Sequence, residues 1–205
     1  SKNAQRYYKK YAKAKHAQAV LTEQIGLAER ELEYLSSVQD ALARAETERD
    51  FAELRQELTV AGLCGDRRAP KNGKKGGRPL PSKPLAFTLT SGRTVRVGKN
   101  NLQNDALTFG ADKTDIWFHV KGFPGSHAVL FTDGAEPTDL DYTESAMLAA
   151  YHSKASGGVN VQVDYTPVRY VKKPAGAKPG FVVYDRYFTA VVRAALPDGV
   201  REQKK

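Results

Sequence analysis

The side chains most able to do chemistry gather in one short segment, Asp115–Lys121. Successive side chains of a strand point to opposite faces, so Ile116, Phe118 and Val120 would enter a core. The opposite face would carry a carboxylate, the only tryptophan, a histidine and a lysine, namely Asp115, Trp117, His119 and Lys121. This face could recognise RNA, with Trp117 or His119 stacked on a base or sugar and Lys121 on a phosphate. Alternatively, a helix covers the strand, Trp117 is packed, and the polar groups bond to loops.

The turn that follows, Gly122–His127, adds glycines, a hydroxyl group and a second histidine. Ser126 beside His127 is no catalytic pair by adjacency alone, because a hydrolase also needs an orienting acid and an oxyanion hole. His119, His127 and Asp115 match no spacing typical of metal ligands. The sequence therefore predicts a binding surface, with no catalytic residues, metal or cofactor.

Two further segments could contact phosphate or sugar. Residues 98–105 combine a lysine with amide side chains at a helix start, which suits anion binding, although simple helix capping explains the same residues. Residues 169–180 form a basic loop that matches neither a Walker loop nor a Rossmann fingerprint. From these two segments we take as candidate RNA-binding residues Lys99, Asn100, Asn101, Asn104, Lys172, Lys173 and Lys178. The other candidates are Arg93, Asp115, Trp117, His119, Lys121, Ser126 and His127.

Residues 85–205 must position these groups, and their pattern predicts a small α+β domain. Its sheet would be mixed and mostly antiparallel, with one main helix over residues 140–154 and a shorter helix over 101–109. The predicted strands cover 87–90, 94–97, 115–120, 128–131, 159–165, 168–171, 181–184 and 187–192.

Residues 1–62 predict a helical arm. Apolar positions recur at alternating steps of four and three from Tyr7 to Leu42, as in a coiled coil. Such a narrow seam needs a partner helix, and 1–62 contains none of matching length, which indicates either a dimer or a piece of a longer chain. Of these two explanations, we favour a piece of a longer chain. A capping box at Thr47 and Asp50 predicts a second helix that stops at Gly62, followed by a basic, flexible linker over 63–84.

The positive charge is concentrated in two places. The chain has 205 residues and a net charge of +9. Residues 1–15 hold six basic groups and no acid, and residues 63–84 hold seven basic groups against one acid. The first run is either a solvated helix face or a phosphate-contacting tip. Such charge favours a nucleic acid partner over a membrane. The sequence has one cysteine, no apolar core of a secretory signal peptide, and no apolar stretch long enough to span a membrane. It therefore predicts a cytoplasmic protein.

Several segments resemble the RqcH/NEMF family, often labelled fibronectin-binding protein A-like. The resemblance to its NFACT-R RNA-binding domain is carried by VGKNNLQND (97–105), DIWFHVKGFPGSHAVL (115–130), AAYHSKA (149–155) and VDYTPVRYVKKPAGAKPGFVVY (163–184). The segments NAQRYYKKYAKAK (3–15), ELEYL (31–35) and AELRQEL (52–58) resemble the coiled-coil arm of the family and the helix before NFACT-R.

This resemblance implies a role in ribosome-associated quality control. Family members bind obstructed large ribosomal subunits and tRNA, and direct C-terminal tailing of stalled chains, with alanine in bacteria. The expected partners are therefore the large subunit, ribosomal RNA, a tRNA (alanine tRNA in bacteria) and a partner helix for the arm. The family's N-terminal module and first coiled-coil helix have no counterpart here, which puts tailing by this chain alone in doubt. A protein-interaction module and a surface adhesin remain alternatives.

Overall fold

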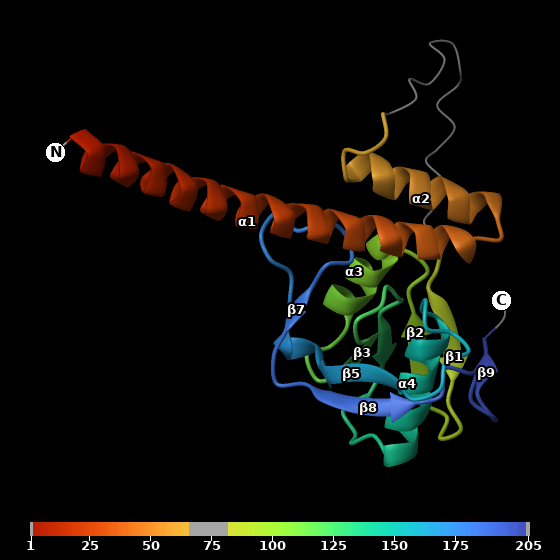
Figure 1. Ribbon diagram of the computed structural model, residues 1–205. Helices are drawn as coiled ribbons and strands as arrows, with labels where there is room; N and C mark the ends of the chain where they lie inside the picture. Colours follow the sequence, from red (N-terminus) through yellow and green to blue (C-terminus); the bar gives the residue numbers. More distant parts are fainter. Residues whose placement is uncertain (1, 66–81, 204–205) are drawn as a thin grey trace, which may run out of the picture. The chain divides into compact units, whose positions relative to one another are not determined.

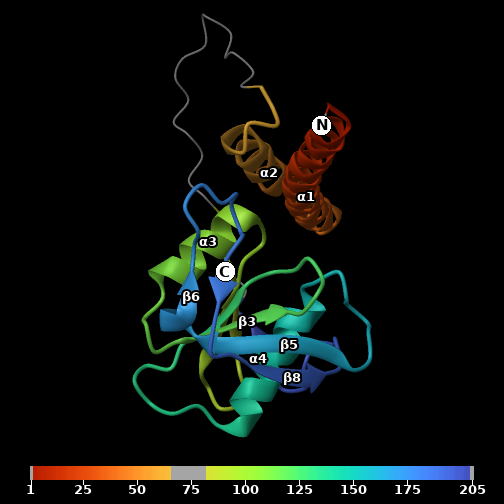
Figure 2. The ribbon, with the colours of Figure 1, turned by 60° about the vertical axis from the view of Figure 1, so that its left-hand side comes forward.

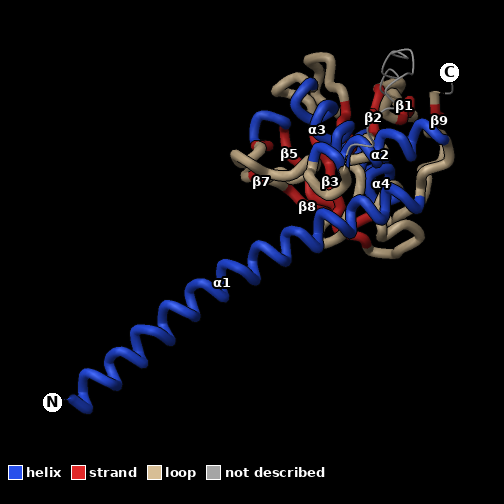
Figure 3. Tube along the Cα trace, turned by 90° about the horizontal axis from the view of Figure 1, so that it is seen from above, coloured by secondary structure: helices blue, strands red, loops and turns tan. Residues whose placement is uncertain are grey.

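The computed structural model describes residues 2–65 and 82–203. Helix α1 spans Lys2–Ala43 without interruption (Figure 3), in agreement with the predicted arm and with the absence of proline from this stretch. Residues up to Ser36 form one unit, and residues from Ser37 onward form a second, compact unit. In the first unit, apolar seam residues such as Tyr7, Tyr11 and Leu21 are exposed.

Helix α2 (Glu48–Val60) begins at the predicted capping box. The Thr47 side chain accepts a hydrogen bond from the Asp50 backbone N–H, and the Asp50 carboxylate accepts one from the Thr47 N–H. The chain leaves this helix through Gly62, whose φ of 76° lies in the left-handed region that glycine enters at little cost. Residues 66–81 of the predicted linker lie outside the described residues.

A seven-stranded antiparallel sheet forms the centre of the second unit (Figures 1 and 2). Its strand order is β8-β5-β3-β4-β2-β1-β9. The strands are β1 (Leu85–Thr88), β2 (Thr94–Val97), β3 (Ile116–Val120), β4 (Ala128–Leu130), β5 (Val161–Pro167), β8 (Phe188–Val192) and β9 (Arg201–Glu202). A separate two-stranded sheet pairs β6 (Val171–Lys172) with β7 (Val183–Tyr184). The predicted α+β class is confirmed.

Each face of the large sheet is covered by a helix. On one face α4 (Asp139–Tyr151) packs its alanines and Leu148 against Phe118, Leu130 and Val163. On the other face α3 (Asn101–Gly110) contributes Leu107 to a second core with Trp117, Val129 and Val171. Trp117 on β3 therefore lies between the sheet and α3, which the alternation of side chains alone did not decide.

Two short elements differ from the prediction. The strand expected over 168–171 begins as a 3₁₀ turn (Val168–Tyr170) and reaches strand geometry only in β6. Strand β9 was not predicted, because two residues offer too few positions for an alternating pattern. Among the described residues, no helix combines the length and hydrophobicity needed to cross a membrane.

Candidate nucleic-acid interface

The start of α3 is held by carboxylates from α2. Asp50, Glu53 and Glu57 are spaced by three and four residues, which places them on one helix face. Asn101 donates to Glu57 through its backbone N–H at 3.0 Å and through Nδ2 at 2.8 Å. Asn100 Nδ2 donates to Glu53 at 2.9 Å, while its side chain caps α3 by accepting from the Gln103 N–H.

Of the two explanations offered for residues 98–105, anion binding and helix capping, the structure therefore supports helix capping. Lys99 Nζ lies 3.4 Å from the Asp50 carboxylate, and Asn104 Oδ1 accepts from the His127 N–H at 3.1 Å. Asn100, Asn101 and Asn104 are buried. The expectation that these three amides touch RNA is corrected by their burial, because protein groups already occupy the helix start.

Three more predicted site residues are buried in loop contacts. Asp115 accepts hydrogen bonds from the backbone N–H groups of Asp112 and Thr132, both at 2.9 Å. Ser126 Oγ accepts from Arg44 at 3.1 Å, and His127 Nδ1 bonds the Thr108 hydroxyl at 2.8 Å. Since all three are at most 3% exposed, they shape the loops and cannot touch RNA themselves in this structure.

Trp117 is fully buried, which corrects the expectation that it stacks on a base. Its ring packs against Tyr184 at a centroid distance of 4.9 Å, and His119 stacks on it at 5.7 Å. Trp117 faces away from the α4 core, as predicted, but α3 and the β6–β7 sheet cover that face. Of the two alternatives for this strand, the structure supports the packed one for Trp117.

His119, which is half-buried, and His127, which is buried, are both neutral at physiological pH. Burial lowers the pKa of His119 to about 4, although the nearby Asp164 carboxylate opposes the shift. Burial also lowers the pKa of His127 well below its usual range, and His119 adds to this effect. Neither imidazole therefore supplies positive charge, and attraction for a polyanion must come from lysine and arginine.

Asp164 on β5 connects this core to the surface. Its carboxylate, 1% exposed, accepts hydrogen bonds from the Tyr184 hydroxyl at 2.8 Å and the Thr189 hydroxyl at 2.6 Å. Lys121 Nζ lies 3.8 Å from the same carboxylate, while the Lys121 side chain remains 44% exposed. Burial and the bond to Asp164 raise the pKa of Tyr184 well above its usual range, so this hydroxyl keeps its proton.

Beyond Asp164 lies a surface of interleaved cations and aromatic rings, which we call the Tyr170 surface. Its members are Lys121, Arg169, Tyr170, Lys172, Arg186 and Tyr187. The Arg169 and Arg186 guanidinium groups lie 5.0 and 5.2 Å from the centroid of the Tyr170 ring. Lys121 Nζ lies 5.4 Å from the centroid of the Tyr187 ring. Guanidinium planes and aromatic rings are the groups on which unpaired bases stack.

The turn between β7 and β8 presents part of this surface. Arg186 has a φ of 50°, which is uncommon for a residue other than glycine, and such conformations often mark functional turns. Lys172 is 69% exposed and lies 3.9 Å from the exposed Asp185, whose backbone N–H donates to the Tyr170 carbonyl. Of the four cations of the surface, Lys121 lies near the buried Asp164 carboxylate and Lys172 near the exposed Asp185, which leaves a net positive patch.

The remaining predicted cations differ in their roles. Arg93 lies 3.4 Å from the buried Asp141 and donates to the carbonyls of Thr132 and Glu136, which makes it a structural residue. Lys173 pairs with Asp105, and Lys178 is partly exposed in the loop before β7. Lys121 and Lys172 are thus the predicted cations that this surface brings together.

Four residues of the Tyr170 surface were not among the predicted site residues, although Arg169 and Tyr170 belong to the basic loop predicted over 169–180. The dipeptide Arg-Tyr occurs at 6–7, 169–170 and 186–187, and the last two lie within and just after the 163–184 segment. This repeated pairing of a cation with an aromatic ring was the available signal. Only the pairing of β6 with β7 shows that the last two dipeptides meet.

Comparisons with known proteins identify the domain that carries this surface. Residues 83–185 match the family model described as NFACT protein RNA binding domain, and residues 1–76 match NFACT N-terminal and middle domains. The Rqc2 homolog RqcH of Bacillus subtilis (strain 168) is 46% identical over 195 residues, which is 94% of this chain and 33% of that protein. The chain belongs to the RqcH/NEMF family.

Other members agree with this assignment. The Rqc2 homolog RqcH of Streptococcus suis (strain 05ZYH33) is 45% identical over 90% of this chain and 32% of its own length. The chain thus spans about a third of the length of these curated RqcH relatives. A solved structure, the C-terminal of the fibronectin/fibrinogen-binding protein from Streptococcus suis, superposes with a TM-score of 0.81. It is 42% identical and covers 94% of this chain and 75% of its own.

Proposed function

We propose that this chain is the RNA-binding part of a cytoplasmic ribosome-associated quality control factor, and that it binds tRNA or ribosomal RNA through the Tyr170 surface. The proposal is carried by one observation: the cations and rings of this surface converge in and beside the segment that matches the NFACT RNA-binding model. The RqcH relatives support the quality-control role.

In the whole protein, this chain would help to bind obstructed large subunits and tRNA and to direct alanine tailing of stalled nascent chains. The chain would position RNA without forming the bonds, and tailing would use the ribosome's own catalytic centre. The contacts of the two histidines fit this division of roles, because the two rings pack against each other and His127 also packs on Trp117 and bonds the Thr108 hydroxyl.

Salt dependence tests the RNA-binding step. We expect tRNA to bind the chain with an affinity that falls at least about tenfold between about 50 and about 200 mM salt, because neutralised phosphates release counterions. Fluorescence anisotropy of labelled tRNA gives the affinity at each concentration. An affinity that does not change with salt, or no detectable binding at low salt, would contradict the proposal.

Protein binding is the second candidate function. It is favoured by the similarity to the Streptococcus suis structure, which is described as part of a fibronectin/fibrinogen-binding protein. Titrating labelled fibronectin in the same buffers separates the two candidates. Tight fibronectin binding without tRNA binding would favour a surface adhesin over an RNA-binding protein.

A further inference from the structure

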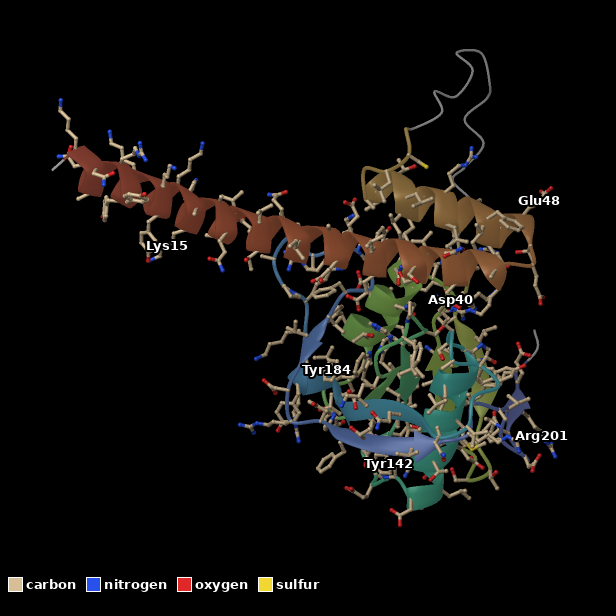
Figure 4. All side chains as sticks on the ribbon, viewed as in Figure 1. Lys15, Asp40, Glu48, Tyr142, Tyr184 and Arg201 are labelled. Atoms are coloured by element: carbon tan, nitrogen blue, oxygen red, sulfur yellow. The ribbon has the colours of Figure 1, made fainter. Side chains whose placement is uncertain are left out.

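A concave site lies on the face of the sheet opposite to α3, His119 and His127. Its volume is about 400 Å³ and it opens between the first turns of α4 and strands β5 and β8. Its lining consists of Asp139, Tyr142, Thr143, Tyr165, Phe188 and Ala190. Figure 4 shows Tyr142 of this site beside β8, whereas Tyr184, close to the Tyr170 surface, lies on β7.

Three aromatic rings form the wall of this site. Tyr142 and Tyr165 lie 5.2 Å apart at an angle of 44°, and Tyr165 and Phe188 stack at 5.7 Å. Phe188 is 64% exposed although its neighbour Tyr165 packs against the core. Ring faces carry partial negative charge and attract ammonium and guanidinium groups.

The rim of the site is acidic, on a chain whose net charge is +9. Asp139 is exposed in the first turn of α4, and Glu136 is exposed three residues earlier. Burial, Glu136 and Asp139 together raise the pKa of Tyr142. Arg93 lowers the pKa of Tyr142, but its guanidinium group is already held by the buried Asp141 and by two backbone carbonyls.

This electrostatic pattern selects the kind of ligand. Carboxylates at the rim repel the phosphates of RNA but pair with a basic side chain, which the rings would also attract. Strand β8 stands at the end of the sheet order and pairs only with β5 among the described strands. An exposed sheet edge accepts an extended peptide as an added strand.

We propose that this site binds a lysine or arginine side chain from an extended, basic segment of a partner protein that lies along β8. The aromatic wall surrounds the aliphatic stem and the cation, and Asp139 pairs with the charged end. This interaction is separate from RNA binding, because it uses the opposite face of the sheet.

The test uses a fluorescein-labelled peptide of alternating valine and threonine with one central arginine, and a second peptide with citrulline in its place. We expect the arginine peptide to bind the chain about tenfold more tightly, because citrulline keeps the shape and loses the charge. Phe188→Ala and Asp139→Asn should each weaken the arginine peptide about threefold to thirtyfold. The matched exposed variants Phe123→Ala and Asp133→Asn should leave its affinity unchanged.

Three outcomes would overturn the proposal. Equal affinity for the two peptides would exclude recognition of charge, and full affinity in Phe188→Ala and Asp139→Asn would exclude this site. A loss of tRNA affinity in Phe188→Ala, with no loss of peptide affinity, would assign the rings to base stacking. Because Phe188 is 64% exposed, its substitution should leave the fold intact, which circular dichroism checks.

Discussion

Removal of two guanidinium groups, by Arg169→Ala with Arg186→Ala, should weaken tRNA binding at least about tenfold at low salt. Both groups lie about 5 Å from the Tyr170 ring, so the double variant removes positive charge and stacking planes at the centre of the surface. The slope of log affinity against log salt should fall by about two, since about two phosphate contacts are lost. Anisotropy titrations over a range of salt concentrations measure both quantities.

A charge-matched control separates local contacts from net charge. Arg55 on α2 and Arg201 on β9 are exposed, and β9 lies at the opposite end of the sheet order from β8 (Figure 4 labels Arg201). Arg55→Ala with Arg201→Ala lowers the net charge by the same amount. Equal losses in the two double variants would show that the Tyr170 surface has no special role.

Glu57→Ala should destabilise the second unit by about 3 kcal/mol. Glu57 is fully buried and accepts hydrogen bonds from the Asn101 backbone N–H and from Asn101 Nδ2. Alanine would leave both donors without this acceptor and would remove a negative charge from the N-terminus of α3. Urea unfolding followed by circular dichroism measures the change.

Two comparisons make the Glu57 prediction specific. Glu57→Gln keeps one acceptor oxygen and should destabilise the unit less than alanine does. Glu48→Ala, an exposed position on the same helix, should change stability by less than about 0.5 kcal/mol. If Glu57→Ala unfolds at the same urea concentration as the unchanged chain, the buried carboxylate does not hold α3 in place.

Local patterns predicted most of the elements. The Thr47–Asp50 capping box and the alternation along 115–120 each depend on neighbours in sequence, and the structure confirms the helix and the strand that they predict. The strands predicted over 87–90 and 94–97 are found as the pair β1 and β2. The alternation also assigned Trp117 to the face opposite Phe118, as found.

Long-range packing decided what the sequence could not. Alternation says which side chains share a face, but only the placement of α3 and β7 shows that Trp117 is covered. The amides of 98–105 fit capping and phosphate binding equally well until the α2 carboxylates are seen to bond them. Tyr170 and Arg186 are sixteen residues apart and meet through the pairing of β6 with β7.

The Tyr170 surface is the proposed place where RNA is held. The most direct test is ultraviolet cross-linking of the chain to tRNA at low salt, followed by mass spectrometry of the linked peptides. We expect cross-links in the second unit to fall on residues 169–172 and 186–187, with Tyr170 and Tyr187 among them. Cross-links confined to α4 or β9, with those two segments unmodified, would contradict the account.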